Sequence, residues 1–152
     1  VPDWSVQGDH MHLCVEAHDE RLLSTGLRSF NVRVAKGLNR ELGRSGQVVA
    51  DRYHARILRT PREVRNCLAY VLNNARHHAH ALSRHWSDAC SSGAMFEGWR
   101  GAVHHDPDAR EGPVTTAAPH TWLRREGWRR CGLISVDEVP GLPGPVWIRL
   151  SV

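Results

Sequence analysis

The chain has 152 residues, of which 41% are hydrophobic, so it is large enough for one domain with an apolar core and is not expected to be disordered. Its 20 Lys and Arg against 16 Asp and Glu give a net charge of +4, which favours a polyanionic partner such as nucleic acid. All of these basic residues except Lys36 are arginines. Arginine suits bidentate phosphate binding, although a GC-rich genome produces the same bias.

Membrane, secreted and zinc-ribbon proteins are disfavoured by the sequence. No apolar stretch is long enough to span a membrane, and no signal-peptide pattern is present at the start. The four cysteines contain no pair at C-x-x-C spacing, which argues against a zinc ribbon. We therefore expect a cytoplasmic protein with reduced thiols.

The first element that the sequence predicts is a β-hairpin. Residues 4–7 indicate a strand end, Gly8-Asp9 is a turn signal, and residues 10–17 alternate as a second strand. One face of that strand is apolar, and the other carries His10, His12, Cys14 and Glu16. The chain starts at Val1 directly in strand-like sequence, so we expect a preceding segment to be missing.

Two amphipathic helices are predicted next. Leucine, valine and phenylalanine recur every three or four residues from 19 to 42, which is typical of a helix. Residues 47–58 indicate one or two short strands. A second helix is predicted from the capping box of Thr60 and Glu63, with Pro61 at the first helical position, to about residue 82.

The character of the chain changes after Trp86. Gly, Pro and His are frequent between residues 98 and 119, and only a short helix is predicted, around 121–130. We therefore divide the chain into a catalytic domain at residues 1–86 and an accessory tail at residues 87–152 that is partly irregular and packs only in part.

Four side chains indicate a metal-assisted reaction. His10 and His12 are two apart on a strand, so their imidazoles point the same way and can share a metal ion. Tyr70 and Asn74 are four apart on a helix, so they project from one face. Two imidazoles and an amide oxygen leave coordination positions open, as a catalytic metal needs, and the phenol would lie near whatever the metal polarises.

Three motifs in this order resemble those of the HUH single-tyrosine transposases, and more narrowly the REP-associated tyrosine transposases. The first is the histidine strand at 6–17 (VQGDHMHLCVEA), and the second is the pair of segments at 51–56 (DRYHAR) and 60–66 (TPREVRN). The third is the tyrosine with an amide four residues on, at 70–74 (YVLNN). The resemblance covers about residues 3–82, with weaker similarity at 91–99 and 121–141.

The resemblance implies an α+β, ferredoxin-like antiparallel sheet flanked by helices, here lacking its N-terminal strand and helix. It implies a DNA-transposition enzyme, nucleoid-associated in a bacterial cytoplasm, that acts on single-stranded or hairpin DNA as a monomer or weak dimer. Tyr70 would form a 5′-phosphotyrosine and release a 3′-hydroxyl, with Mg²⁺ or Mn²⁺ held by His10, His12 and Asn74. The sequence departs from the family at Ala75, where a proline often follows the amide.

Other interpretations of these residues remain open. Tyr53 is the only other tyrosine, and its surroundings suit packing or DNA contact; Asn73 is an alternative ligand on a different helical face. Asp9 and Glu16 flank the histidines and can orient an imidazole or be simply solvated. His78 is the best spare ligand. Four arginines are candidate phosphate contacts, or merely exposed: Arg52, Arg56, Arg62 and Arg65.

Two alternative functions also remain. The chain can be a catalytically inactive, truncated or domesticated DNA-binding relative, or a relative of replication initiators and relaxases, which share the chemistry but not the surrounding motifs. Trp86, Trp99, Trp122 and Trp128 can stack unpaired bases or pack in the core.

Overall fold

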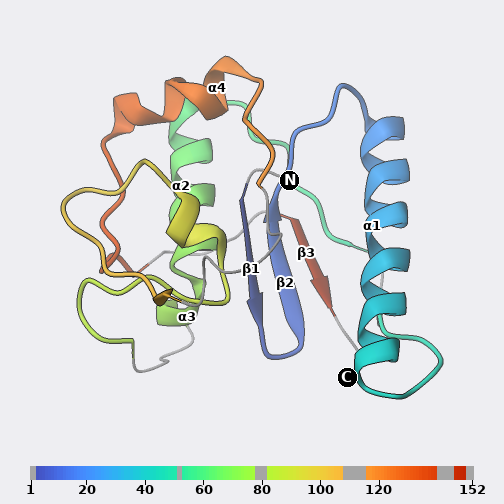
Figure 1. Cartoon of the computed structure of the whole chain (residues 1–152). Coiled ribbons are helices and arrows are strands. Elements are labelled where there is room, and N and C mark those ends of the chain that lie inside the picture. The colour runs from blue at the N-terminus through green and yellow to red at the C-terminus, as the bar shows by residue number, and fades with distance from the viewer. Residues whose placement is uncertain (1–2, 51–52, 78–81, 108–115, 140–145, 150–152) are drawn as a thin grey trace.

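A three-stranded antiparallel sheet lies at the centre of the fold (Figure 1). The computed structural model describes residues 3–50, 53–77, 82–107, 116–139 and 146–149. Strands β1 (Asp3–Gln7) and β2 (His10–Cys14) form the predicted hairpin, with Gln7 opposite His10. Strand β3 (Val146–Arg149) pairs with the other edge of β2, so the histidine strand is central.

Helices cover both faces of this sheet (Figure 1). Helix α1 (Glu20–Glu41), capped by Asp19, confirms the predicted first helix, and its Leu27 is buried in one core with Met11 and Leu13 of β2. Helix α2 (Pro61–Leu72) forms a second core with Cys14. The alternation of β2 is thereby confirmed, with each face buried under a helix. The α+β class is also confirmed, whereas the described strands do not amount to a ferredoxin-like sheet.

Helix α2 begins as predicted and ends earlier than predicted. The Thr60 hydroxyl accepts from the Glu63 N–H and the Glu63 carboxylate accepts from the Thr60 N–H, which completes the capping box. The helix ends at Leu72, and a four-residue helix, α3 (Asn74–His77), follows a break at Asn73. The amide of Asn73 donates to the carbonyls of Ser135 and Glu138, at 2.9 Å each, and thereby holds the break in place.

The segment at 47–58 was predicted as strand, and this is wrong for the described part of it. Only Val49 and His54 show isolated bridges, and the rest is extended loop. The side-chain amide of Gln47 donates to the carbonyls of Val49 and Ala50, which occupies acceptors that a strand ladder would use. Residues 51 and 52 lie outside the described part.

The described residues after 86 pack more deeply than expected. They form two short 3₁₀ helices, η1 (Ser92–Met95) and η3 (Gly127–Cys131), and helix α4 (Trp122–Arg125) near the predicted helix. Trp128 and Ile134 are fully buried in the core of α2. The expected boundary at residue 86 therefore divides residues that share one core. None of the described helices is long and apolar enough to cross a membrane.

Arg65 joins α2 to the segment after η3. Its guanidinium donates to both carboxylate oxygens of Glu138, at 2.6 and 2.7 Å, and more weakly to the carbonyls of Gly132 and Leu133. These hydrogen bonds from Arg65 hold the pKa of Glu138 below its ordinary value of 4.5. Because the carboxylate form is favoured in the folded state, the pair stabilises the fold above that pH.

We expect this contribution to be lost as the pH falls below about 4.5, through the lowered pKa of Glu138. Glu138→Gln should lower the free energy of unfolding at neutral pH and flatten its decline in acid, as measured by urea denaturation at a series of pH values. Glu41→Gln is the control, because its ion pair with Arg40 is exposed. An unchanged acid slope in Glu138→Gln would contradict this role.

Candidate functional site

His10 and His12 lie side by side on the face of β2 that α2 covers. Their ring centroids are 4.8 Å apart, and the rings meet edge to face. His12 is buried, with 4% of its surface exposed, whereas the side chain of His10 retains 20%. The period of the strand thus brings the two imidazoles together, as the sequence predicts, with His10 on the solvent side.

Asp9 orients the imidazole of His10. Its carboxylate lies 2.9 Å from Nδ1 of His10, so a proton on that nitrogen leaves the lone pair on Nε2. Glu16, the other carboxylate near the histidines in sequence, has a different use. It accepts from the backbone N–H groups of His120 and Thr121, ahead of α4. Of the two, only Asp9 is placed to tune a histidine.

Tyr70 projects from α2 onto His12. The ring centroids are 4.9 Å apart and nearly perpendicular, at 87°. Tyr70 is itself 7% exposed, so little of its surface reaches solvent. Packing of α2 on the sheet therefore joins the histidine motif to the tyrosine motif across a long stretch of sequence. Tyr53, the other tyrosine, lies elsewhere. Its hydroxyl is 2.9 Å from that of Ser24 on α1, and its ring packs in the core on the opposite face of the sheet.

Asn74 is fully buried at the start of α3, four residues after Tyr70. Neither atom of its side-chain amide has a hydrogen-bond partner among the described residues. A buried amide without partners destabilises a fold by about 1–3 kcal/mol, so an ion, a water or a substrate group bound at Asn74 would offset that cost. Asn73, the alternative ligand, uses its amide nitrogen to hold two carbonyls.

Two imidazoles and an amide oxygen make a coherent donor set for a divalent cation. Within the described ranges no three His, Cys, Asp or Glu side chains gather as a metal cluster. The ligand set expected from the sequence includes the amide of Asn74, which is not of these types. Amide oxygen suits hard divalent cations such as Mg²⁺ and Mn²⁺, whereas imidazole also suits softer divalent metals. The spare ligand His78 lies outside the described residues.

The four candidate phosphate-binding arginines are in different situations. Arg62 is exposed on the first turn of α2, and Arg56 is exposed and paired with Glu63 at 3.0 Å. Arg65 is engaged by Glu138 and two carbonyls, so its guanidinium serves the fold. Arg52 lies outside the described part of the chain. Phosphate contact by Arg56 and Arg62 remains a prediction.

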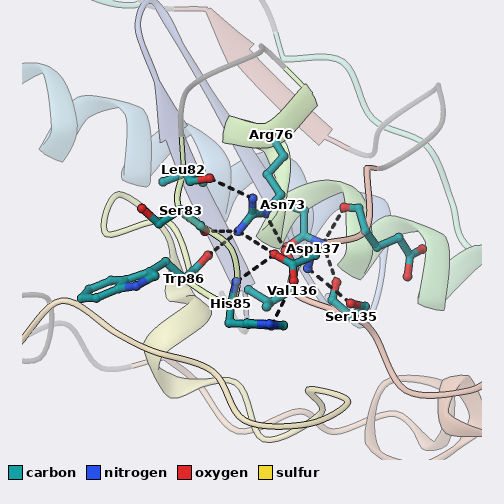
Figure 2. Close-up of polar contacts among 10 residues, drawn as sticks. Asn73, Arg76, Leu82, Ser83, His85, Trp86, Ser135, Val136 and Asp137 are labelled. Carbon is teal, nitrogen blue, oxygen red and sulfur yellow. Dashed lines mark hydrogen bonds and ion pairs between the residues drawn. The ribbon is translucent and has the colours of Figure 1, made fainter.

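Arg76 is a residue whose importance the sequence did not reveal. Figure 2 shows its guanidinium at the centre of a group of acceptors from two segments, 82–86 and 136–137. It forms an ion pair with Asp137 at 3.2 Å. It also donates to four backbone carbonyls, those of Leu82, Ser83, Trp86 and Val136. Nothing in the sequence distinguishes Arg76 from an exposed arginine near a helix end. Its acceptors in the segments 82–86 and 136–137 show that it holds these segments against the helix that begins with Asn74.

The sequence matches no protein-family model, and neither a curated protein nor a solved structure matches the chain.

Proposed function

We propose that the chain is a metal-dependent enzyme that nicks and rejoins single-stranded or hairpin DNA, as in DNA transposition. Tyr70 is the nucleophile, and His10, His12 and Asn74 hold Mg²⁺ or Mn²⁺. We also propose that the complete fold is the ferredoxin-like fold of the HUH endonucleases. The observation that supports it most is the contact of Tyr70 with His12, because it joins two motifs that independently indicate this chemistry.

The reaction is a phosphoryl transfer to tyrosine. The phenol oxygen of Tyr70 forms a bond to phosphorus as the bond to the 3′ oxygen breaks, and the phenolic proton is lost while the 3′ oxygen gains one. The product is a 5′-phosphotyrosine and a 3′-hydroxyl, so attack by a hydroxyl reverses the step and rejoins strands without consuming a nucleotide. A bound cation would supply Lewis-acid polarisation of the phosphate.

The protein residues have separate tasks in this reaction. Asp9 holds the ring of His10 in one orientation, and the edge-to-face contact with His12 fixes the ring of Tyr70. Because Tyr70 is 7% exposed, a strand that can bend locally would reach its hydroxyl more readily than a stiff one. An unpaired strand bends more readily than a duplex, whose stiffness opposes local deformation, and this supports a single-stranded substrate.

Covalent-adduct formation tests the proposal. Labelled single-stranded hairpin DNA incubated with the protein and Mn²⁺ should give an adduct that survives denaturation. Tyr70→Phe should reduce its yield on the order of 10³-fold or more, because the nucleophilic oxygen is removed. Tyr53→Phe is the matched control and should retain the adduct. Absence of an adduct with the wild type, or its survival in Tyr70→Phe, would refute the proposal.

The low exposure of Tyr70 also supports a second candidate, a catalytically inactive DNA-binding relative. In that case the wild-type protein binds single-stranded DNA, and Tyr70 forms no adduct with either metal. The adduct assay described above, combined with a measurement of single-stranded DNA binding, separates the two candidates.

A further inference from the structure

Trp86 is an exposed tryptophan whose surroundings differ from those of the other three that the sequence singles out. Trp128 is fully buried, and Trp99 packs partly buried against the same core. Trp122 is 47% exposed, but the guanidinium of Arg130 lies 4.9 Å above its ring. Trp86 is 39% exposed. Its ring lies against that of His104, with 5.6 Å between the ring centroids and an angle of 31° between the ring planes.

The backbone around Trp86 is held firmly. Its carbonyl accepts from Arg76 at 2.8 Å, and its N–H donates to the carbonyl of Ser83. The backbone of His104 is hydrogen-bonded to residues on either side of Trp86. Its N–H donates to the carbonyl of His85 at 2.7 Å, and its carbonyl accepts from the N–H of Ser87 at 3.0 Å. Figure 2 shows the indole pointing away from the Arg76 group. An exposed aromatic ring is thus presented in a fixed position, which lowers the entropy lost on binding.

Two hydrogen bonds connect the segment around Trp86 to the elements that carry the candidate site. Arg76, which binds the Trp86 carbonyl, belongs to the short helix that begins with Asn74. On the other side, Asp88 accepts from the side-chain amide of Gln7 at 2.5 Å, and Gln7 pairs with His10 across the hairpin. The segment that contains Trp86 and Asp88 is therefore hydrogen-bonded to both α3 and β1.

The surroundings of Trp86 indicate what it binds. Ser83, Arg84 and His85 are all exposed beside it. Nδ1 of His85 lies 3.0 Å from the carboxylate of Asp137, so the indole is an aromatic face among polar and charged groups. A protein partner usually needs a contiguous apolar patch. A nucleobase needs one aromatic face, and its phosphate is attracted by neighbouring cations.

We propose that Trp86, backed by His104, is a stacking site for an unpaired base of the DNA strand on which Tyr70 acts. The inference rests on the proposed function for the identity of that strand, and its stacking part is measurable alone. Stacking on an aromatic residue tolerates any base, so the site contributes affinity without sequence specificity.

The test compares two probes of equal length, a fluorescent oligothymidylate and a fluorescent strand of abasic phosphodiesters. Anisotropy titrations of the full chain should show tighter binding of oligothymidylate. Trp86→Leu should weaken that binding about tenfold and leave binding of the abasic strand unchanged, while Trp86→Phe should retain most of it. Trp122→Leu is the matched control and should change neither. Thermal melting checks that each variant is folded.

Each result bears on the inference. If Trp86→Leu leaves the preference for oligothymidylate intact, or weakens both probes equally, the stacking site is refuted. If the preference falls and the variant also needs about ten times more hairpin DNA for half-maximal adduct on Tyr70, the inference is supported in full. If the preference falls but the wild type forms no adduct, the base-stacking site stands and the proposed function fails.

Discussion

Asn74→Leu is expected to make the protein more stable and inactive at the same time. The amide of Asn74 is fully buried, and neither of its polar atoms is hydrogen-bonded within the described part of the chain. Leucine has a similar volume and needs no partner, so the free energy of unfolding in chelator-treated buffer should rise by about 1 kcal/mol. If Asn74 is a metal ligand as proposed, the variant should also lose the adduct.

Metal-induced stabilisation gives a readout that does not depend on activity. Added Mn²⁺ should raise the melting temperature of the wild type by binding the folded state, and should leave that of Asn74→Leu unchanged. The neighbouring substitution Asn73→Leu is the control for position. It removes two hydrogen bonds to Ser135 and Glu138, so it should destabilise the fold by about 2 kcal/mol. A destabilised Asn74→Leu would show that the amide has a structural partner.

Arg76→Met is expected to be the most destabilising single change considered, by about 3 kcal/mol. The side chain of Arg76 is 12% exposed and that of its partner Asp137 is 25% exposed, so the arginine is the more buried member of the pair. Removing the charge leaves Asp137 without this counterion and four carbonyls without their common donor. Methionine retains the apolar stem, so the loss measures the polar group.

Chemical denaturation of Arg76→Met beside Arg40→Met measures this effect. Arg40 is 79% exposed and pairs with Glu41, also exposed, so its replacement should change stability by less than about 1 kcal/mol. Arg76 also holds the carbonyl of Trp86, so Arg76→Met should weaken the preference for oligothymidylate as well. Equal stability of the two variants would show that Arg76 is an ordinary surface arginine.

The parts of the fold that the sequence predicts are those fixed by local periodicity. Period two placed His10 and His12 on one face of a strand, and the capping box placed the start of α2 at the correct residue. The approach of Tyr70 to His12 follows once the helix packs on the strand. These features need few long-range contacts to be specified, so one sequence suffices to find them.

The parts that the sequence did not predict depend on partners far along the chain. Asn73 ends α2 by binding carbonyls that lie more than sixty residues away. Arg65 and Arg76 read as surface arginines, yet each is bound by the segment at 132–138. Glycine and proline after residue 98 suggested a loose tail, whereas Trp128 and Ile134 complete the core. Periodicity carries no information about such partners.

The central position of β2 has a consequence for how the site is made during synthesis. Its neighbours are β1, which precedes it directly, and β3, whose Arg149 pairs with His10. The chain is made from its N-terminus, so the histidine strand has one free edge until almost all of the described residues have been translated. Pairing between such distant segments is slow, and an open strand edge can join another chain. A ribosome that stalls before residue 146 therefore leaves one edge of the histidine strand open to pairing with another chain.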